Sequence, residues 1–357
     1  MKKLLALLLA LVMVLSFAAC NNQPADDQSE SQSESESESQ SEVSEPETTA
    51  ASYKLGMGVS VSTKSSKAGN AQVDATVAAV VLDAEGKIVA ADLDVAQNIL
   101  AITDGVVDVA TFDARTKKEK KEDYGMKGVS PIGKEWYEQA DAFCQFVIGK
   151  TGAEVAALET KEENGHNVAV DETLYAGCTM DITAFVDAFT KACNDEYARE
   201  FTADEFTLGL SAVSTVDSET ASATADANGK AYMYTEFAAV AVDKDGKILA
   251  ALIDSIQPKI TFDTKGEIVE AAFKGTKKEL KEDYGMAAIM GVPEWYIQAT
   301  AFEDFITGLT GDEVANLETK QNDHGYNVAA DETLYAGCTI QITGYMESVA
   351  KAVANAK

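Results

Sequence analysis

Histidine and basic residues are scarce in this chain, and their scarcity excludes some classes of binding partner and site. The 357 residues include two histidines, and 29 Lys and Arg stand against 59 Asp and Glu, for a formal net charge of −30. A chain this acidic lacks the basic surface that neutralises phosphates, so we expect no nucleic-acid partner. The same charge opposes adsorption to anionic lipid, and any attachment to a membrane must therefore have another cause.

A long apolar run occurs at the N-terminus, where the chain reads "MKKLLALLLALVMVLSFAAC". Two lysines, an apolar run and small residues before Cys20 have the layout of a secretory signal, and the run is short for a membrane-spanning helix. Small residues directly before a cysteine resemble the bacterial lipoprotein signal. The resemblance implies that residues 1–20 are a signal peptide and that Cys20 is lipidated on the outer face of the cytoplasmic membrane. A plain secretory signal with an incidental cysteine is the alternative.

Residues 21–51 have almost nothing to bury, because they consist mainly of Ser, Glu, Gln and Asp. Such a segment cannot offset the entropy lost on ordering, and its like charges repel one another. We predict a disordered acidic tether that holds the folded part away from a membrane.

The rest of the chain is an internal repeat that consists of two similar copies. A shift of 160 residues aligns "GKIVAA" at 86–91 with "GKILAA" at 246–251, and "KEDYGM" at 121–126 with the same letters at 281–286. We predict two tandem domains, at residues 52–200 and 204–357, each of a usual size for an independent domain. Each is expected to unfold cooperatively when produced alone.

Each copy begins with strand patterns and continues with helical ones. Hairpin signals surround "DAEGKI" in the first copy and "DKDGKI" in the second, which adds another hairpin at "KITFDTKGEIVEAAF". Helical patterns follow at 135–149, after Thr151 as an N-cap, and in an amphipathic run after Thr179. Antiparallel strands followed by separate helices predict an α+β fold with an antiparallel sheet.

The register of the two copies excludes several shared sites. Cys144 and Cys193 have no cysteine counterpart in the second copy, so the copies cannot share a disulfide framework. His166 and His324 stand at different positions, which excludes a histidine mechanism or metal site common to both. No phosphate-binding Gly-rich loop of the nucleotide type is present.

The nine letters "DETLYAGCT" occur at 171–179 and again at 331–339. We predict that the glycine adopts backbone angles closed to other residues and leaves room for a close approach, and that the final threonine begins a helix. Free N–H groups at a helix start favour a phosphate, although a threonine there can also act only as a cap. A third interpretation makes the cysteines redox thiols whose pKa the helix N-terminus lowers. The residues concerned are Gly177, Cys178, Thr179, Gly337, Cys338 and Thr339.

"AGCT" before an amphipathic helix, in a domain with "DAEGKI" hairpins, resembles the FMN-binding domain family. Its members include flavin-carrying subunits of the sodium-pumping NADH:quinone reductase and of Rnf complexes, and tandem-domain extracellular lipoproteins of Gram-positive bacteria. The family motif is Ser/Thr-Gly-Ala-Thr, with FMN joined through its phosphate to the last threonine. The resemblance implies attachment at Thr179 and Thr339, although Ala176 and Ala336 replace the hydroxyl residue of the motif.

A flavin also needs flat or soft contacts for its ring. Each copy has Tyr, Met, Trp and Tyr close together, and we take Tyr124, Trp136, Tyr284 and Trp295 as candidate ring contacts. Aromatic residues at such spacing are equally typical of a hydrophobic core.

The resemblance therefore implies a lipid-anchored flavoprotein that relays electrons through FMN in each copy, rather than an enzyme that turns over a substrate. Its partners would be a membrane reductase or quinone system and an extracellular electron acceptor. The alternative is a non-catalytic surface or ligand-binding lipoprotein of the same fold without flavin.

Overall fold

The computed structural model describes residues 50–357, so the predicted signal peptide, Cys20 and nearly all of the predicted tether lie outside the described residues. Residues Thr49–Lys357 form one compact unit. Both copies of the repeat belong to it, and two separate tandem domains are therefore not confirmed. No helix within residues 50–357 is long and apolar enough to cross a membrane.

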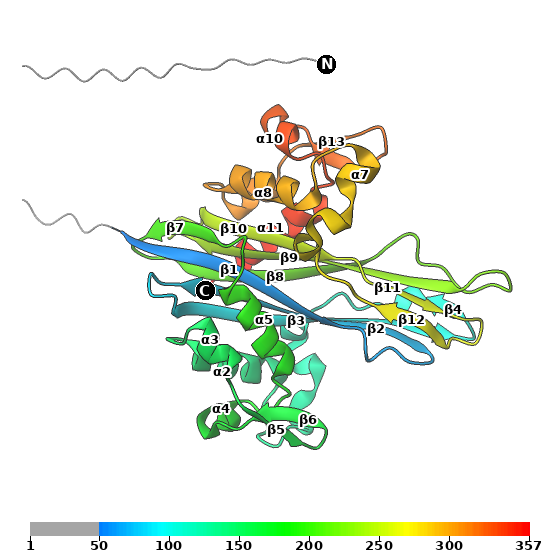
Figure 1. Cartoon of the computed structure of the whole chain (residues 1–357), viewed down its shortest axis with the longest axis horizontal. Coiled ribbons are helices and arrows are strands. Elements are labelled where there is room, and N and C mark those ends of the chain that lie inside the picture. The colour runs from blue at the N-terminus through cyan, green and yellow to red at the C-terminus, as the bar shows by residue number, and fades with distance from the viewer. Residues whose placement is uncertain (1–49) are drawn as a thin grey trace, which may run out of the picture. The chain divides into compact units, whose positions relative to one another are not determined.

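Two antiparallel sheets lie at the centre of the molecule (Figure 1). The first has the strand order β4-β3-β2-β1-β7, and in the second the long strand β9 pairs with β8, β10 and β11. The predicted α+β class with antiparallel strands is thus confirmed. The strands of the first sheet are β1 (Ala51–Ser62), β2 (Asn70–Leu82), β3 (Ile88–Thr103), β4 (Val106–Asp108) and β7 (Arg199–Ala203). Those of the second are β8 (Thr207–Val216), β9 (Gly229–Val242), β10 (Ile248–Ile256), β11 (Lys259–Phe262) and β12 (Ile268–Ala272).

The helices of each copy cover the outer face of that copy's sheet, so the order of layers is helices, sheet, sheet, helices (Figure 1). The two copies repeat the same order of helices, apart from small differences in the short turns. The first copy has η1 (Val109–Thr111), α1 (Lys117–Lys120), η2 (Lys121–Tyr124), η3 (Met126–Gly128), α2 (Trp136–Val147), α3 (Gly152–Ala156), α4 (Glu172–Gly177) and α5 (Thr183–Cys193), with a hairpin of β5 (Thr160–Glu163) and β6 (His166–Ala169). The second has α6 (Lys277–Leu280), η4 (Lys281–Tyr284), α7 (Met286–Met290), α8 (Trp295–Ile306), α9 (Gly311–Ala315), α10 (Glu332–Gly337) and α11 (Thr343–Asn355), with β13 (Thr319–Gln321) and β14 (Asn327–Ala329).

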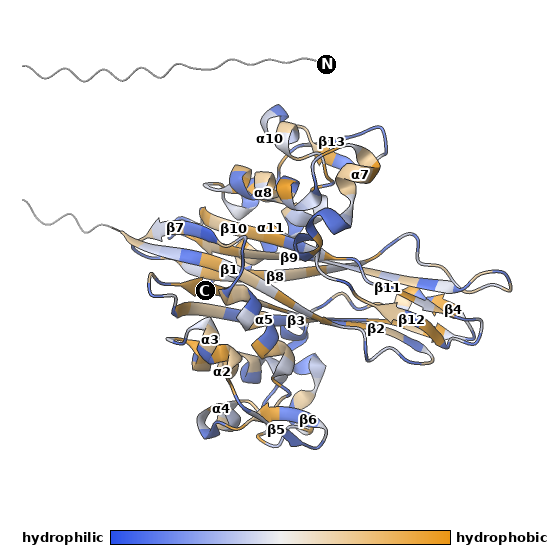
Figure 2. Cartoon of the chain, viewed as in Figure 1, coloured by the Kyte–Doolittle hydropathy of each residue, from blue (hydrophilic) through white to orange (hydrophobic). Residues whose placement is uncertain are grey.

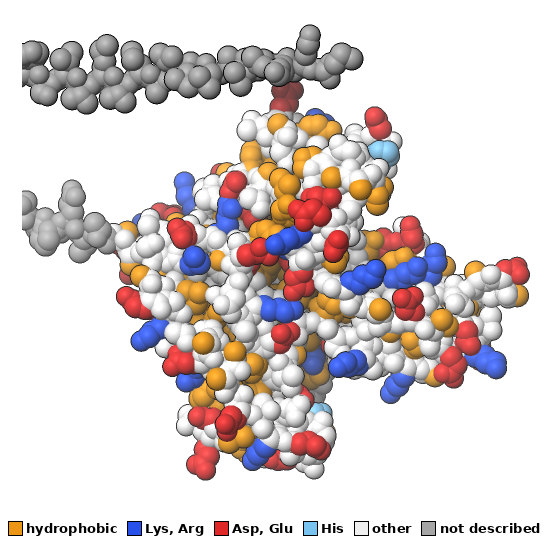
Figure 3. Space-filling view, in the orientation of Figure 1, with side chains coloured by type: hydrophobic (Ala, Val, Ile, Leu, Met, Phe, Trp, Pro, Cys, Tyr) orange, Lys and Arg blue, Asp and Glu red, His pale blue; other side chains and the backbone are white. Residues whose placement is uncertain are grey.

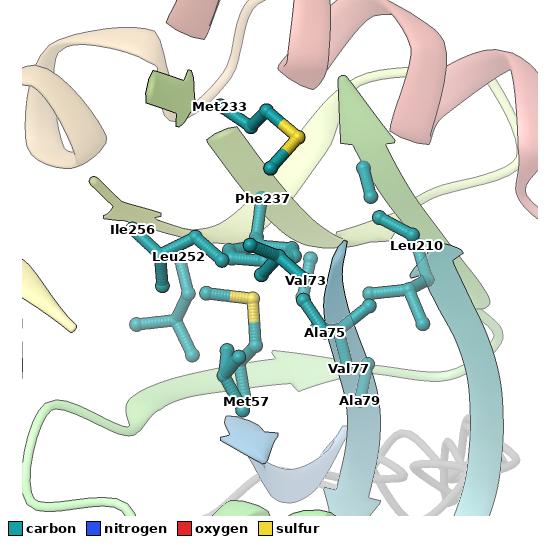
Figure 4. Close-up of a cluster of buried hydrophobic side chains, with 14 of the residues drawn as sticks. Met57, Val73, Ala75, Val77, Ala79, Leu210, Met233, Phe237, Leu252 and Ile256 are labelled. Atoms are coloured by element: carbon teal, nitrogen blue, oxygen red, sulfur yellow. The ribbon is translucent and has the colours of Figure 1, made fainter. Parts of the chain in front are cut away.

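The core between the sheets is built from both copies. Side chains alternate along a strand, so Val73 and Val77 of β2 face the other sheet whereas Val80 faces the helices. Met233 and Phe237 of β9 meet the first group from the opposite side (Figure 4). Because both faces of each sheet are covered, the strands read as nearly continuous apolar runs, visible along the central strands in Figure 2.

The first strand of each copy, β1 and β8, was not recognised from the sequence. Both contain glycine where the long last helix of the same copy crosses them. A Cβ on Gly56 would overlap the carbonyl oxygen of Ala192 in α5, and a Cβ on Gly209 would overlap that of Ala352 in α11. Glycine interrupts the strand pattern in the sequence because it permits this close approach of helix and sheet.

Candidate functional site

The nine-residue motif forms a short helix and an extended segment, not the start of a helix at the threonine. Asp171 caps α4, its Oδ1 accepting the backbone N–H of Thr173 at 2.9 Å and of Leu174 at 3.0 Å. The chain leaves α4 at Gly177, and α5 begins only at Thr183. The prediction that Thr179 and Thr339 begin helices is wrong, because the tight α4 turn is followed by an extended stretch before the long helix.

Each motif threonine is held by a buried glutamine from the facing helix. Gln139 Oε1 accepts the backbone N–H of Thr179 at 2.9 Å and its hydroxyl at 3.2 Å. In the second copy Gln298 Oε1 accepts the same two groups of Thr339, at 2.7 and 3.0 Å. Both glutamines are fully buried. The hydroxyl oxygen keeps its lone pairs free, since it acts here as a donor.

The glutamine is itself fixed by the loop that precedes its helix. Gln139 Nε2 donates to the carbonyl of Lys134 and to Ser130 Oγ, both at 3.1 Å. Glu135, at the N-cap of α2, accepts the backbone N–H of Met126 at 2.9 Å through its carboxylate. Sequence reasoning missed this glutamine, although the repeated pattern "EWYxQ" at 135–139 and 294–298 carries the signal.

The motif glycines serve for close approach and not for unusual backbone angles. Neither Gly177 nor Gly337 has a positive φ. A Cβ on Gly177 would lie 2.9 Å from the Cβ of Ala142 in α2, and one on Gly337 would lie 3.0 Å from that of Ala301 in α8. The glycine therefore lets α4 and α10 pack against the helices that carry the glutamines.

The motif cysteines are not activated thiols. Cys178 and Cys338 are fully buried, and burial raises the pKa of Cys178 to about 11 and that of Cys338 to about 12. No helix N-terminus lies beside them, because each follows the end of a short helix. The interpretation of these residues as redox thiols with lowered pKa values is wrong. All four cysteines of the described part of the chain are free.

A cavity of about 570 Å³ in the first copy brings together most of the residues predicted there. Thr179, Tyr124 and Trp136 all line it, together with Gln139 and Lys117. Gly177 and Cys178 do not line it, and Cys178 is buried in the hydrophobic cluster that also contains Trp136. A volume of this size lies within the roughly 300–1,000 Å³ range of small-molecule and cofactor sites. Its other lining side chains come from β1, β2, β3, β6, the loops after β1 and η3, the segment between α4 and α5, and the start of α5, among them Thr76, Val95, Ser130, His166, Met180, Asp181, Ala184 and Phe185.

A lysine stands over the two aromatic rings of this cavity, and sequence reasoning missed it. Lys117 Nζ lies 4.9 Å from the ring centre of Tyr124 and 5.6 Å from that of Trp136. Thr116 caps α1 in a reciprocal capping box with Glu119, which places the lysine at the first helical position. Within residues 50–357 this lysine forms no ion pair, so its charge faces the cavity without a carboxylate partner.

The tryptophans belong to the core as well as to the site. Trp136 and Trp295 are 2% and 1% exposed, and Trp136 packs edge-on against Phe185 with the ring centres 6.1 Å apart. The core interpretation of these aromatics is thus confirmed, while the edge of Trp136 also lines the cavity. In the second copy Lys277 Nζ lies 5.3 Å from the ring centre of Trp295 and 5.4 Å from that of Tyr284.

An acidic side chain in the cavity lining, Asp181, limits which ligands the cavity can hold. Asp181 accepts backbone N–H groups of Asn167 at 3.0 Å and Thr183 at 2.9 Å. Burial alone would raise its pKa, but these hydrogen bonds outweigh that effect and lower the pKa of Asp181 below its ordinary value. The cavity lining therefore carries a negative charge at Asp181 as well as the lysine Lys117.

Comparison with known proteins gives one distant relative. No family model matches the chain, and no solved structure matches it. A protein of Desulfitobacterium hafniense named chlorophenol reductase is 31% identical over 137 residues, which cover 34% of this chain and 42% of that protein. The chain thus spans less than half the length of this relative.

Proposed function

We propose that this chain is a lipid-anchored, extracytoplasmic electron-transfer flavoprotein, with FMN in the cavity of the first copy. The observation that carries the proposal is the convergence of Thr179, Tyr124 and Trp136 on one cavity. The family resemblance implies Thr179 for attachment, the chemistry of a flavin ring favours Tyr124 and Trp136 as contacts, and the three residues come from separate segments of the chain.

The lining supports a ligand with one flat aromatic end and one anionic end. Tyr124, Met126 and Trp136 offer aromatic and thioether surface, while Lys117 offers a positive charge and the hydroxyl oxygen of Thr179 offers its lone pairs. This pairing of apolar walls with a few polar groups is typical of cofactor sites. FMN, with its flat ring system and terminal phosphate, has the matching chemistry.

In this proposal Thr179 Oγ1 carries the phosphate as an ester. An ester removes the hydroxyl hydrogen that Gln139 now accepts, but Gln139 still accepts the backbone N–H of Thr179 and holds the segment in place. Lys117 offsets part of the phosphate charge, and the buried Trp136 fixes one wall. When bound, the cofactor supplies one- and two-electron transfer, and the protein orients it and excludes water.

The distant relative supports a redox role, because its name describes a reductase. The electron donor would be a membrane reductase or quinone system and the acceptor an extracellular one, as the resemblance implies. The N-terminal lipid at Cys20 would keep the protein near such a donor.

Intact mass and visible absorbance test the proposal. The protein should be purified from its native host, or from a strain that also supplies a flavin-attaching enzyme. Attachment forms a bond between Thr179 Oγ1 and phosphorus and breaks the pyrophosphate of a flavin dinucleotide, releasing adenosine monophosphate, which takes up the hydroxyl proton. We expect flavin absorbance and a flavin mononucleotidyl group at Thr179, and Thr179→Ala should lose the group at this residue.

Protein from such a source with an unmodified mass and no flavin absorbance would contradict the proposal. The alternative function, a binding lipoprotein without flavin, would then be favoured. Its support is Ala176, which stands where the family motif has a hydroxyl residue.

A further inference from the structure

The two copies differ at the cavity although their motifs are identical. With the 160-residue register, Thr76 of β2 corresponds to Glu236 of β9, and the strand pairing agrees, since Thr76 lies opposite Val95 and Glu236 opposite Ser255. Thr76 lines the cavity of the first copy. A small side chain has thus been replaced by a longer, charged one at a cavity wall.

Glu236 points into the space that the first copy leaves open. Its carboxylate lies so close to Gly344 that a Cβ there would overlap both carboxylate oxygens. The counterpart of Gly344 is Ala184, which lines the open cavity and has a Cβ. The glycine in the second copy makes room for the glutamate.

A second difference between the copies fills more of the space beside Glu236. Phe185 of the open cavity corresponds to Tyr345, which is 2% exposed. The Tyr345 hydroxyl lies 3.4 Å from Nζ of Lys277, the counterpart of Lys117, as an acceptor. Lys277 is 9% exposed, and burial lowers the pKa of Lys277 to about 8. The lysine that faces an open cavity in the first copy is enclosed in the second.

The cavities reflect this difference. A cavity of about 330 Å³ touches Lys277 and Tyr284, but its lining includes neither Thr339 nor Trp295. It extends instead toward β11 and β12, through Lys259 and Glu270. Thr339 thus does not line the cavity beside Lys277, whereas Thr179 shares one cavity with Lys117.

We infer that the first copy alone binds the cofactor, and that Glu236 is the specificity-determining residue that closes the second copy. This inference rests on the proposed function for the identity of the ligand. Glu236 excludes an anionic ligand in two ways, since its side chain occupies the space and its carboxylate repels a phosphate. The second copy keeps the motif and the glutamine because they also hold its helices together.

Alanine variants give the first test, because each removes the hydroxyl to which the group would be attached and leaves the backbone N–H of the threonine bonded to its glutamine. Protein made with the flavin-attaching enzyme should carry one flavin mononucleotidyl group, and peptide mapping should place it on Thr179. Thr179→Ala should carry none, and Thr339→Ala should keep the wild-type mass. Two additions in the wild type, or one remaining in Thr179→Ala, would overturn the inference and leave the proposed function standing.

Exchange of the wall residues gives the second test. Glu236→Thr should add a second group on Thr339, whereas Glu236→Gln, which keeps the size of the side chain, should not. The reverse change, Thr76→Glu with Ala184→Gly, should remove the group from Thr179. A folded Glu236→Thr protein with a single addition would overturn the role of Glu236. No addition on any variant would contradict the proposed function itself.

Discussion

Lys191 Nζ, on the last helix of the first copy, lies 2.9 Å from Glu279 Oε1, on a short helix of the second. The repeat register maps this pair onto Lys351 and Glu119, and Lys351 Nζ indeed lies 2.7 Å from Glu119 Oε1. Each copy thus offers the other the same contact, as the subunits of a twofold-symmetric dimer do. On the face drawn in Figure 3, acidic and basic side chains are interspersed with apolar ones.

This reciprocal packing changes the expectation for isolated halves. Residues 50–203 and 204–357 each carry one sheet whose inner face forms half of the shared core, including Val77 on one side and Phe237 on the other. Alone, each half would expose that apolar face, so we expect self-association or aggregation. An equimolar mixture should form a one-to-one complex in analytical ultracentrifugation. Two monomeric halves with cooperative unfolding would instead support independent domains, as the sequence alone predicts.

Gln139 should stabilise the fold and the site together. In Gln139→Leu the backbone N–H of Thr179 loses its acceptor, which we expect to lower the free energy of unfolding by about 1–3 kcal/mol. Gln298→Leu is the matched control, with a similar cost in the second copy. Denaturant unfolding measures both. Flavin content should fall only in Gln139→Leu, and an equal fall in both variants would contradict a single loaded copy.

Two buried aspartates predict a pH dependence of stability. Burial raises the pKa of Asp254 to about 6 from 3.8, and that of Asp94 likewise. The folded protein therefore holds these protons more tightly than the unfolded chain, so their contribution lowers the free energy of unfolding as the pH rises from about 4 to about 6. Such a pKa difference corresponds to roughly 3 kcal/mol per group.

Asp254→Asn mimics the protonated form. The stability of the variant, relative to that of wild type, should therefore be higher at pH 7 than at pH 4. Denaturant unfolding at both pH values measures the change, and Asp94→Asn should behave in the same way. A stability difference between variant and wild type that is the same at both pH values would contradict the prediction.

Cys20 lies outside the described residues, and its lipidation remains a prediction. Cys20→Ala should move the protein from the membrane fraction to the soluble extracytoplasmic fraction, detected by immunoblotting after fractionation. Cys193→Ala removes a different cysteine and should leave the protein with the membrane. Unchanged membrane association of Cys20→Ala would remove the lipoprotein assignment.

Local signals in the sequence were sufficient for much of the fold. The hairpin of β2 and β3 was predicted correctly, because Gly86 closes its turn with a φ of 76°. The Thr151 cap was also correct, and it forms a full capping box with Glu154. The pairing of the two sheets could not be predicted, since nothing in one strand indicates which distant face will cover it.

The residues of the candidate site likewise include some that the sequence predicted and some that it did not. The resemblance selected Thr179, and the need of a flavin ring for flat contacts selected Tyr124 and Trp136; the three residues do share a cavity. Gln139 was missed although the repeated pattern "EWYxQ" contains it, because its role depends on Thr179, 40 residues further along the chain. Lys117 was missed because its contacts with Tyr124 and Trp136 depend on how the intervening turns fold. Glu236 was missed for another reason, because a single changed residue in a repeat looks like ordinary variation until its neighbour Gly344 is seen beside it.

The shared core also has a consequence for how such a protein can vary. In a dimer of identical chains, every substitution appears in both subunits and alters both sites at once. Here the partner surface is part of the same polypeptide, so the association does not weaken on dilution, and each half accepts changes that the other does not receive. A residue such as Glu236 can therefore close the site of the second copy, while the second copy continues to complete the hydrophobic core that it shares with the first.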